Sequence, residues 1–406
     1  MRVVVINQFS PQRVDYLKAM EDQNPEVILL TRNKHEEKFK KIFPKTIGFE
    51  NFEDNDYVYS YINDLHTENP IDRIVATHEF DLVKAGQIRD FLSIPGQNSE
   101  SAIAFRDKYV MKELLKNVIK TPKFKKVNNV VDLLNFKQIN GYPFVLKPVD
   151  GAGSVGVKVI KDNLDFETIL KKGIKENSMA ESFIEGEMYH VDGLFTDGKL
   201  LLSCPSIYIN GCLAFQEEKY VASIMLEKEN SLFERLNDTV LKVLSNLPTP
   251  EHAIAFHAEF FHTPENEIII CEIASRVGGG MIPESIEKCL GIDILSESIR
   301  AQCGIKINPI PSKEKLGGWV IIPPKRGRLI SFNRNIPFNW VVDSYIKEDN
   351  IGKEFEGSNS SVDSIASFVI EGENHTQILK RIDTLFKWVE ENSIWEIDRE
   401  KITTAN

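Results

Sequence analysis

The sequence lacks the features that would place the protein in a membrane, outside the cell or on nucleic acid. No apolar run approaches the roughly 18 residues that cross a bilayer, and the N-terminal MRVVVINQFS is typical of a short strand, not of a cleaved signal. The five cysteines are odd in number and show no C-x-x-C spacing, which indicates reduced thiols and no metal knuckle. A net charge of −11 disfavours a general binder of the phosphate backbone. We therefore expect a cytoplasmic protein without membrane or nucleic-acid partners.

Length and composition predict a globular chain of two or three domains. The chain has 406 residues, of which 42% are hydrophobic and 27% charged, too many for one ordinary core and too apolar for a disordered chain. Residues 1–100 alternate strands with helices, the pattern of a parallel sheet covered on both faces. Strands are expected at 2–7, 27–32 and 72–77, with helices near 11–22, 55–67 and 81–92. No G-x-G-x-x-G follows the first strand, so dinucleotide binding is not expected there.

A glycine-rich loop lies between two short strands in the next unit. Residues 99–117 read as one long helix with Lys108 in its middle, and a strand then ends at Lys147. The loop DGAGSVG, residues 150–156, leads directly into a second strand at 157–160. Strand, glycine loop and strand suit a flap whose backbone amides close over phosphates, with Lys147 opposing their charge. A plain glycine-rich turn is the structural alternative.

The most informative stretch is residues 254–280, IAFHAEFFHTPENEIIICEIASRVGGG. Two runs rich in β-branched and aromatic residues flank HTPEN, which predicts a hairpin. Folding about 265–266 places Glu259 opposite Glu272, with side chains on the order of 5 Å apart on one face. Two like charges so placed repel each other. The repulsion is relieved by a protonated carboxyl group, by a basic partner such as Arg276, or by a bound divalent cation.

The segment after the hairpin favours an anion site. Arg276 precedes the glycine run 278–280, and a helix at 281–290 begins directly after it. Paired acids, an arginine, bare glycines and a helix N-terminus together suit an anion held by Mg²⁺. The sequence therefore predicts a nucleotide-phosphate site here, with the glycine loop as its second element.

The rest of the chain carries less chemistry. An amphipathic helix at 231–247 is expected to pack behind the hairpin 254–280. From about residue 309 the pattern changes to strands and a closing helix at 376–392. This C-terminal part reads as a separate α+β cap with no obvious chemistry of its own.

Four stretches, taken together, resemble the ATP-grasp superfamily and within it the carboxylate–amine ligases of the L-amino-acid ligase type. They are IPGQNSESAIAFRDKYVMKELL, YPFVLKPVDGAGSVGV, ESFIEGEMYHVDG and HAEFF…CEIASRVGGG, in this order. The resemblance covers the whole chain and implies an α/β and α+β protein with the ATP-grasp fold. It divides the chain into a doubly wound, Rossmann-like domain at 1–100, an ATP-grasp region at 101–307 with a lid at 121–182, and a C-terminal α+β domain at 308–406.

The resemblance also implies roles for individual residues. ATP would be held by two lysines, the glycine loop and the adenine-binding edge: Lys108, Lys147, Gly151, Gly153, Ser154, Gly156, Glu181, Phe183 and Ile184. Glu259 and Glu272 would bind Mg²⁺, with Mn²⁺ as an alternative metal. Arg276 would stabilise the acyl-phosphate and, with Lys147, the phosphoryl group in transfer. Gly278 and Gly279 would leave room for the carboxylate substrate.

Two positions depart from the family pattern. Ala274 stands where the common Glu-x-Asn-x-Arg motif has Asn, and a methyl group offers Mg²⁺ no oxygen, which puts a second metal ion in doubt. Met188 stands where many members have a ribose-binding Glu, and either Glu187 or His190 would take that role. His257 shares the face of Glu259 and either contacts the substrate or is structural.

The resemblance implies an ATP-dependent ligase that joins the carboxylate of an amino acid to an amine, with release of ADP and phosphate. We expect small-molecule substrates, Glu217 or Glu218 as the partner of a substrate ammonium group, and a homodimer as in many family members. The alternatives are an ATP-grasp carboxylase, a ligase that loads an amino acid onto a carrier protein, and a nucleotide-binding protein without turnover.

Overall fold

The computed structural model describes residues 1–396 and begins with a parallel sheet. Its strand order is β3-β2-β1-β4, and every pair is parallel. The strands are β1 (Arg2–Asn7), β2 (Glu26–Arg32), β3 (Thr46–Phe49) and β4 (Arg73–Ala76), and the helices are α1 (Tyr16–Met20), α2 (Asn33–Lys40), α3 (Tyr57–Glu68) and α4 (Leu82–Leu92). The predicted α/β alternation is confirmed, although α2 and β3 were not predicted and α1 is shorter than expected.

The segment 99–117 is not one helix. It forms α5 (Ser99–Arg106) and α6 (Lys108–Leu115), which are separated at Asp107. The carboxylate of Asp107 accepts hydrogen bonds from the backbone N–H groups of Tyr109 and Val110, so it caps a new helix. Lys108 is therefore the first residue of α6, next to a break that lets it point away from the axis of α5.

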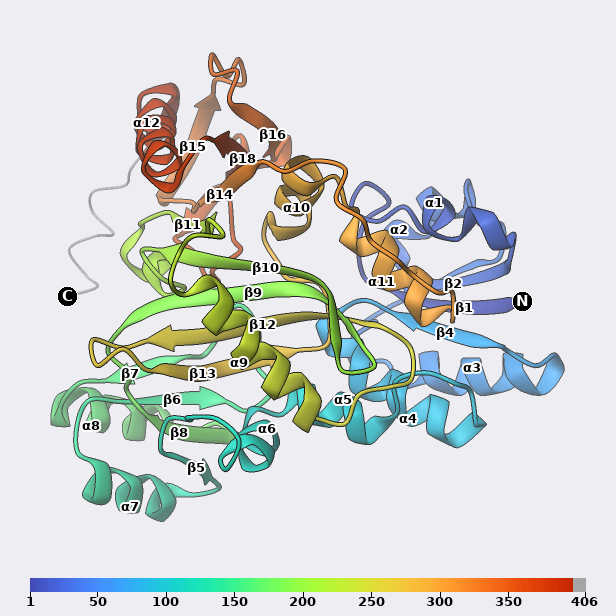
Figure 1. Cartoon of the computed structure of the whole chain (residues 1–406), viewed down its shortest axis with the longest axis horizontal. Helices are drawn as coiled ribbons and strands as arrows, with labels where there is room; N and C mark the ends of the chain where they lie inside the picture. The colour runs from blue at the N-terminus through green and yellow to red at the C-terminus, as the bar shows by residue number, and fades with distance from the viewer. Residues whose placement is uncertain (397–406) are drawn as a thin grey trace.

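A small antiparallel sheet, at the lower left of Figure 1, lies in the segment that was predicted to be a lid. Its order is β5-β8-β6-β7, and the strands are β5 (Phe124–Val127), β6 (Phe144–Pro148), β7 (Lys158–Ile160) and β8 (Ser178–Ser182). Helices α7 (Val130–Asn140) and α8 (Asn163–Lys172) belong to the same unit. Leu146 pairs with Lys158, which confirms the predicted arrangement of strand, glycine loop and strand.

The largest sheet among the described residues has eight strands in the order β13-β12-β9-β10-β11-β14-β18-β16. Five of its eight strands come from the middle of the chain: β9 (Glu187–Thr196), β10 (Lys199–Ile209), β11 (Val221–Met225), β12 (Ile254–His262) and β13 (Ile268–Ala274). Helix α9 (Phe233–Asn246) buries Leu236, Val240 and Val243 in one core with Phe256 and Phe260 of β12, so it covers the hairpin as predicted. Helices α10 (Ile282–Leu290) and α11 (Ile294–Gln302) follow the glycine run.

Three strands of the C-terminal part join the large sheet. Strands β14 (Leu316–Ile322), β18 (Ala366–Gly372) and β16 (Val341–Ile346) extend the large sheet through the pairing of β14 with β11. Helix α12 (His375–Asn392) packs on this half, and β15 (Arg326–Phe332), β17 (Glu354–Glu356) and β19 (Ser393–Glu396) form a small sheet beside it. The chain therefore changes character near residue 309, as predicted, but one sheet continues across the boundary. Residues 397–406 of the predicted C-terminal domain lie outside the described residues.

Between residues 1 and 396, none of the helices combines the length and apolar character that a membrane span requires.

Candidate active site

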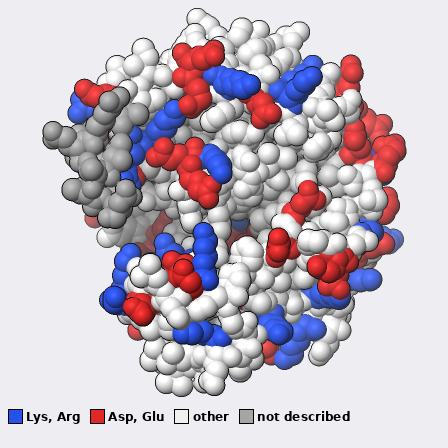
Figure 2. Space-filling view, turned by 90° about the vertical axis from the view of Figure 1, so that its left-hand side faces the viewer, with Lys and Arg blue, Asp and Glu red and all other residues white. Residues whose placement is uncertain are grey.

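One large cavity, of about 1080 Å³, collects most of the predicted site residues. Residues from all parts of the chain line it, including Glu79, Lys147, Glu259, Arg276 and Val362. Figure 2 shows the face at the left of Figure 1, where the surface is hollowed near its centre and acidic and basic side chains are interspersed. A concave site of this size, with charged groups at a few points, is the usual form of a small-molecule site.

The predicted acid pair lies at the floor of this cavity. Glu259 on β12 pairs in register with Glu272 on β13, which confirms the predicted hairpin. A β-bulge follows, because Cys271 is an extra residue between the pairs Glu259–Glu272 and Phe260–Ile270. The side-chain donor atoms of Glu259, Cys271 and Glu272 lie within 4.8 Å of one another. The bulge thus brings three adjacent polar groups to one point of the cavity wall.

The Glu272 carboxylate is held by lysines. Nζ of Lys108 lies 3.2 Å from Glu272 Oε2 and donates a 2.6 Å hydrogen bond to the carbonyl oxygen of Gly151. Burial would raise the pKa of Glu272, but Lys108 and Lys147 outweigh burial and hold it below its usual value. Glu272 is therefore ionised, and Lys108 connects it to the glycine loop.

The Glu259 carboxylate has different neighbours. It accepts a 3.0 Å hydrogen bond from the hydroxyl group of Tyr208 on β10. Nε2 of His257 lies 3.4 Å from Glu259 Oε1. Both His257 and Glu259 line the cavity, as expected for alternate residues of one strand.

A buried ion-pair cluster supports the lid side of the cavity. Glu181 lies between two lysines, with its carboxylate oxygens 2.9 Å from Lys147 Nζ and 3.0 Å from Lys112 Nζ. Burial would lower the pKa of Lys147, but Glu181 raises it above its usual value. Glu181, Phe183 and Ile184 line the cavity. Each oxygen of Glu181 lies within ion-pair distance of a lysine, so Glu181 balances part of the positive charge beside the cavity.

The glycine loop lines one side of the cavity, and hydrogen bonds from outside the loop fix its backbone. Gly151, Gly153 and Ser154 line the cavity, whereas Gly156 does not. At Gly156 the φ angle is +79° and a methyl group would lie 3.1 Å from Cγ of Pro148, so glycine is required there for the turn itself. Arg106, which the sequence did not single out, donates a hydrogen bond to the carbonyl oxygen of Asp150.

Arg276 connects the glycine run to the N-terminal domain. It lines the cavity and its Nε donates to the carboxylate of Glu79, which follows β4 and also pairs with Arg106 at 3.3 Å. Burial disfavours charge on both groups, but their attraction is stronger, so the pKa of Arg276 is raised and that of Glu79 is lowered. Gly278 and Gly279 line the same wall.

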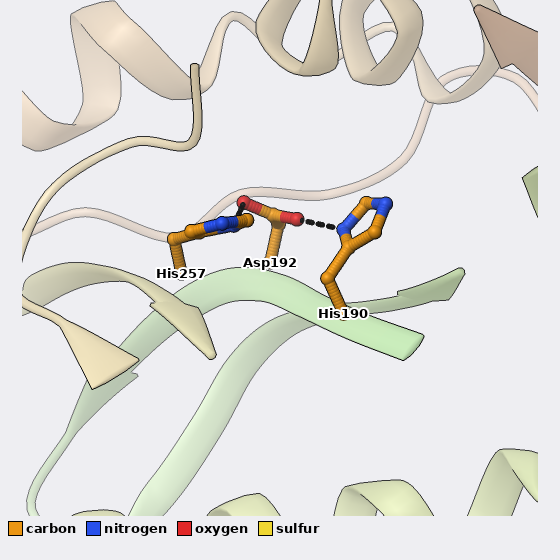
Figure 3. Close-up of side chains that lie close together, drawn as sticks. All are labelled: His190, Asp192 and His257. Atoms are coloured by element: carbon orange, nitrogen blue, oxygen red, sulfur yellow. Dashed lines mark hydrogen bonds and ion pairs between the residues drawn. The ribbon is translucent and has the colours of Figure 1, made fainter. Parts of the chain in front are cut away.

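A second cluster lies behind the cavity wall, where Asp192 accepts hydrogen bonds from two histidines (Figure 3). His190 Nδ1 lies 2.6 Å from Asp192 Oδ2, and His257 Nδ1 lies 2.9 Å from Asp192 Oδ1. His190 Nε2 lies 2.6 Å from the Ser223 hydroxyl oxygen, so both ring nitrogens of His190 are engaged in the protein interior. His190 does not line the large cavity, whereas Glu187 does. This corrects the expectation that His190 contacts a ribose and leaves Glu187 as the candidate.

The structure does not bring Glu217 and Glu218 to the cavity. Both are exposed at a 3₁₀ turn (Ala214–Glu217) and its cap, where Glu217 pairs with Lys219 at 2.6 Å and Glu218 accepts a 3.3 Å hydrogen bond from the backbone of Arg326. The acidic run QEE is therefore part of the solvated surface. The expectation that it receives a substrate ammonium group is corrected.

Several site residues were missed in the sequence. Lys112 lies four residues after Lys108 and shares its helical face, a spacing that the sequence itself shows. Arg106 precedes that break by one residue. Tyr208, Asp192 and the segment 360–362 are near the cavity only because of tertiary contacts, and their local sequence carries no signal.

Residues 140–284 match the ATP-grasp domain family. The chain thus contains a segment of the ATP-grasp domain family, which covers about a third of its length. It is 24% identical over 399 residues to the L-arginine-specific L-amino acid ligase of Bacillus subtilis, covering 93% of this chain and 95% of that protein. This relative is named as a ligase. The predicted fold class and the predicted enzyme class, an ATP-dependent ligase, are confirmed.

Solved ATP-grasp structures have the same fold over nearly the whole chain. The L-amino acid ligase of Bacillus licheniformis superposes with a TM-score of 0.74 at 17% identity, covering 98% of this chain and 99% of that one. The biotin carboxylase domain of the Hydrogenobacter thermophilus 2-oxoglutarate carboxylase, solved with ADP, magnesium and bicarbonate, has a TM-score of 0.71 at 15% identity, with 97% and 90% coverage.

The donor set at the acid pair fits a hard cation. Glu259 and Glu272 offer carboxylate oxygens, the ligands that Mg²⁺ prefers. The third group, Cys271, is a poor competitor, because burial raises the pKa of its thiol to about 12 and keeps it protonated. The two carboxylates, with Lys108 and Lys147 beside them, suit a magnesium–nucleotide complex in this ATP-grasp cavity.

Proposed function

We propose that the protein joins the carboxylate of one amino acid to the amino group of a second in an ATP- and Mg²⁺-dependent reaction. One observation carries the proposal: Glu259 and Glu272 lie side by side in a cavity that also contains Lys108, Lys147 and Arg276. Two acids and three basic groups around one space match the charge of a nucleotide triphosphate with its metal ion. The likeness to an L-arginine-specific L-amino acid ligase supports amino acids as substrates.

In the proposed reaction the substrate carboxylate attacks the γ-phosphorus of ATP. The bond to the bridging oxygen breaks, ADP leaves and an acyl-phosphate forms. The amine then attacks the acyl carbon, phosphate leaves with the bonding electron pair, and the nitrogen loses a proton to give an amide. Mg²⁺ bound by the carboxylates would draw charge from the phosphate oxygens.

The residues contribute mainly by position and charge. Lys108 and Lys147 are fixed by Glu272 and Glu181 before substrate arrives, so little reorganisation is needed when phosphate charge develops. Arg276 is held by Glu79 and stands beside the glycines 278–279, where the carboxylate would lie. The glycine loop would exclude water, which protects an acyl-phosphate from hydrolysis.

The proposal includes the domain boundaries and the roles of individual residues. Helix α5 begins at Ser99 and β14 at Leu316, which supports boundaries near residues 100 and 307, with the lid at about 121–182. Glu187 is the proposed ribose contact. The homodimer, the cytoplasmic location and the use of Mn²⁺ remain predictions of the sequence.

Mass spectrometry tests the proposal directly. The protein is incubated with ATP, Mg²⁺ and a mixture of amino acids, and the expected product is a dipeptide formed together with stoichiometric ADP. The matched control is Arg276→Met, for which we expect the rate to fall about 10²- to 10³-fold, as for removal of one charge-stabilising donor.

The alternatives give different products. A carboxylase would form ADP with bicarbonate and no dipeptide, a possibility that the shared fold of the biotin carboxylase domain keeps open. A carrier-loading ligase would need a phosphopantetheinyl carrier protein. If no ADP forms with amino acids, with bicarbonate or with a carrier, the proposed function is contradicted and a nucleotide-binding protein without turnover is favoured.

A further inference from the structure

The C-terminal loop 358–363 is an ordered part of the cavity wall. The carboxylate of Asp363 accepts hydrogen bonds from the backbone N–H groups of Asn359, at 2.8 Å, and Ser360, at 3.1 Å. The Ser358 hydroxyl group donates to the carbonyl oxygen of Ser360 at 2.9 Å. Because the loop bonds to itself and leads directly into β18, it presents its tip in a fixed orientation.

That tip reaches the glycine loop across the cavity. Ser360, Ser361 and Val362 line the cavity, and the backbone N–H of Ser361 donates a 3.1 Å hydrogen bond to the carbonyl oxygen of Gly153. A segment about 200 residues later in the sequence therefore touches the flap that is proposed to cover phosphates. The C-terminal part, which lacks recognisable chemistry in its sequence, is thus part of the site.

Val362 occupies the corner between the two glycine segments. Its side chain is 46% exposed, towards the cavity. A methyl group placed on Gly153 would lie 4.0 Å from Cγ2 of Val362, and one placed on Gly279 would lie 3.8 Å from Cγ1. One γ-carbon therefore faces the phosphate flap, and the other faces the wall where the carboxylate substrate is proposed to bind.

We propose that Val362 is a specificity-determining residue that limits the size of the amino-acid side chain bound beside Gly279 while the glycine loop is closed. This inference rests on the proposed ligase function. An apolar side chain at this corner offers contact to an apolar group and no hydrogen bond. The substrate that it selects is therefore an amino acid with a small apolar side chain at this position.

Variants on both sides of the corner test the proposal. Val362→Ala enlarges the space, so the ratio of kcat/KM for leucine or phenylalanine to that for alanine should rise about 10-fold, and Val362→Phe should lower it by a similar factor. Gly279→Ala narrows the corner from the opposite wall, in a backbone conformation that alanine tolerates. In the double variant, Val362→Ala should then restore the kcat/KM for the bulkier substrate, because the two changes act on one space. The affinity for a non-hydrolysable ATP analogue should be unchanged in Val362→Ala.

The matched control is Val131→Ala, on the exposed face of α7 and outside the cavity, which should leave the substrate preference unchanged. An unchanged preference in active Val362→Ala and Val362→Phe enzymes overturns the inference but not the proposed ligase function. A wild-type protein that forms no ADP with any amino acid overturns both. Failure of Val362→Ala to recover activity with the bulkier substrate in the Gly279→Ala background would also overturn it, since the two residues would then line separate spaces.

Discussion

The two carboxylates of the acid pair lie side by side but belong to different environments. Glu272 faces a lysine cluster, defined here as Lys108, Lys112 and Lys147 together with Glu181. Glu259 faces a histidine cluster, defined as His190, Asp192 and His257 (Figure 3). The lysine cluster has a surplus of positive charge next to the glycine loop, whereas the histidine cluster surrounds one buried carboxylate.

The difference shows what each side contributes. Buried ion pairs are expensive because both charges lose their hydration, and apolar side chains often stabilise a core equally well. The lysine cluster is therefore best explained by the phosphate charge that it is proposed to receive. In the histidine cluster Asp192 bonds to both histidines and holds the imidazole of His257 beside Glu259, so the cluster positions the acid pair.

The largest effect is expected for Lys112→Met, within the lysine cluster. The Lys112 side chain is fully buried, pairs with Glu181 and donates to the carbonyl oxygen of Cys271. Its removal leaves Glu181 with a single partner, so the free energy of unfolding should fall by about 3–5 kcal/mol, measured by denaturant titration. The control Lys116→Met breaks an exposed pair with Glu113 and should leave the free energy of unfolding nearly unchanged, because solvent screens such a pair. Equal losses in the two variants would contradict the structural role of the cluster.

A comparison of Glu272→Gln with Glu259→Gln separates the two environments. Both variants should weaken Mg²⁺ binding to the nucleotide complex by at least about 10-fold, since each loses one charged ligand. Only Glu272→Gln also removes the partner of Lys108, so it alone should lower the stability of the nucleotide-free protein. Titration calorimetry and thermal unfolding measure the two effects. Metal affinity that is unchanged in both variants would exclude the acid pair as the metal site.

The pH dependence of stability should report the histidine cluster. Burial would lower the pKa of His257, but Asp192 raises it to about 10, above the value of about 6.5 expected for the unfolded chain. A raised pKa means that the folded protein holds the proton more tightly. The stabilisation is therefore complete below pH 6.5 and is lost as the pH rises towards 10. We expect this decline in the free energy of unfolding for chelator-treated wild-type protein and a shallower decline for His257→Asn. Identical slopes in the two proteins would show that His257 does not titrate in this range.

The smallest effect is expected at the surface turn that lies outside both clusters. Glu217→Ala and Glu218→Ala should leave KM for the amino acids unchanged, because both side chains point away from the cavity. Steady-state kinetics with saturating ATP provides the measurement. A raised KM in either variant would show that the turn moves into the cavity when substrate binds.

The sequence by itself determined the elements that rest on local patterns. The pairing of Glu259 with Glu272 follows from strand periodicity and the turn between them, and the glycine loop follows from residues adjacent in the chain. The order of motifs along the chain was sufficient to predict the ATP-grasp fold. The hairpin and the glycine loop each depend on neighbours within about 20 residues, where spacing fixes direction.

Only the tertiary structure decided which charged and apolar groups meet. Glu79 binds Arg276, Lys112 reaches Glu181, and Val362 faces both Gly153 and Gly279, although these residues are far apart in the sequence. The same applies to the two site predictions that were wrong. The QEE residues and His190 had suitable residue types, but their side chains lie at the surface and in the protein interior. The sequence gives the chemistry of each side chain, but the partner of that side chain depends on how separate sheets pack together.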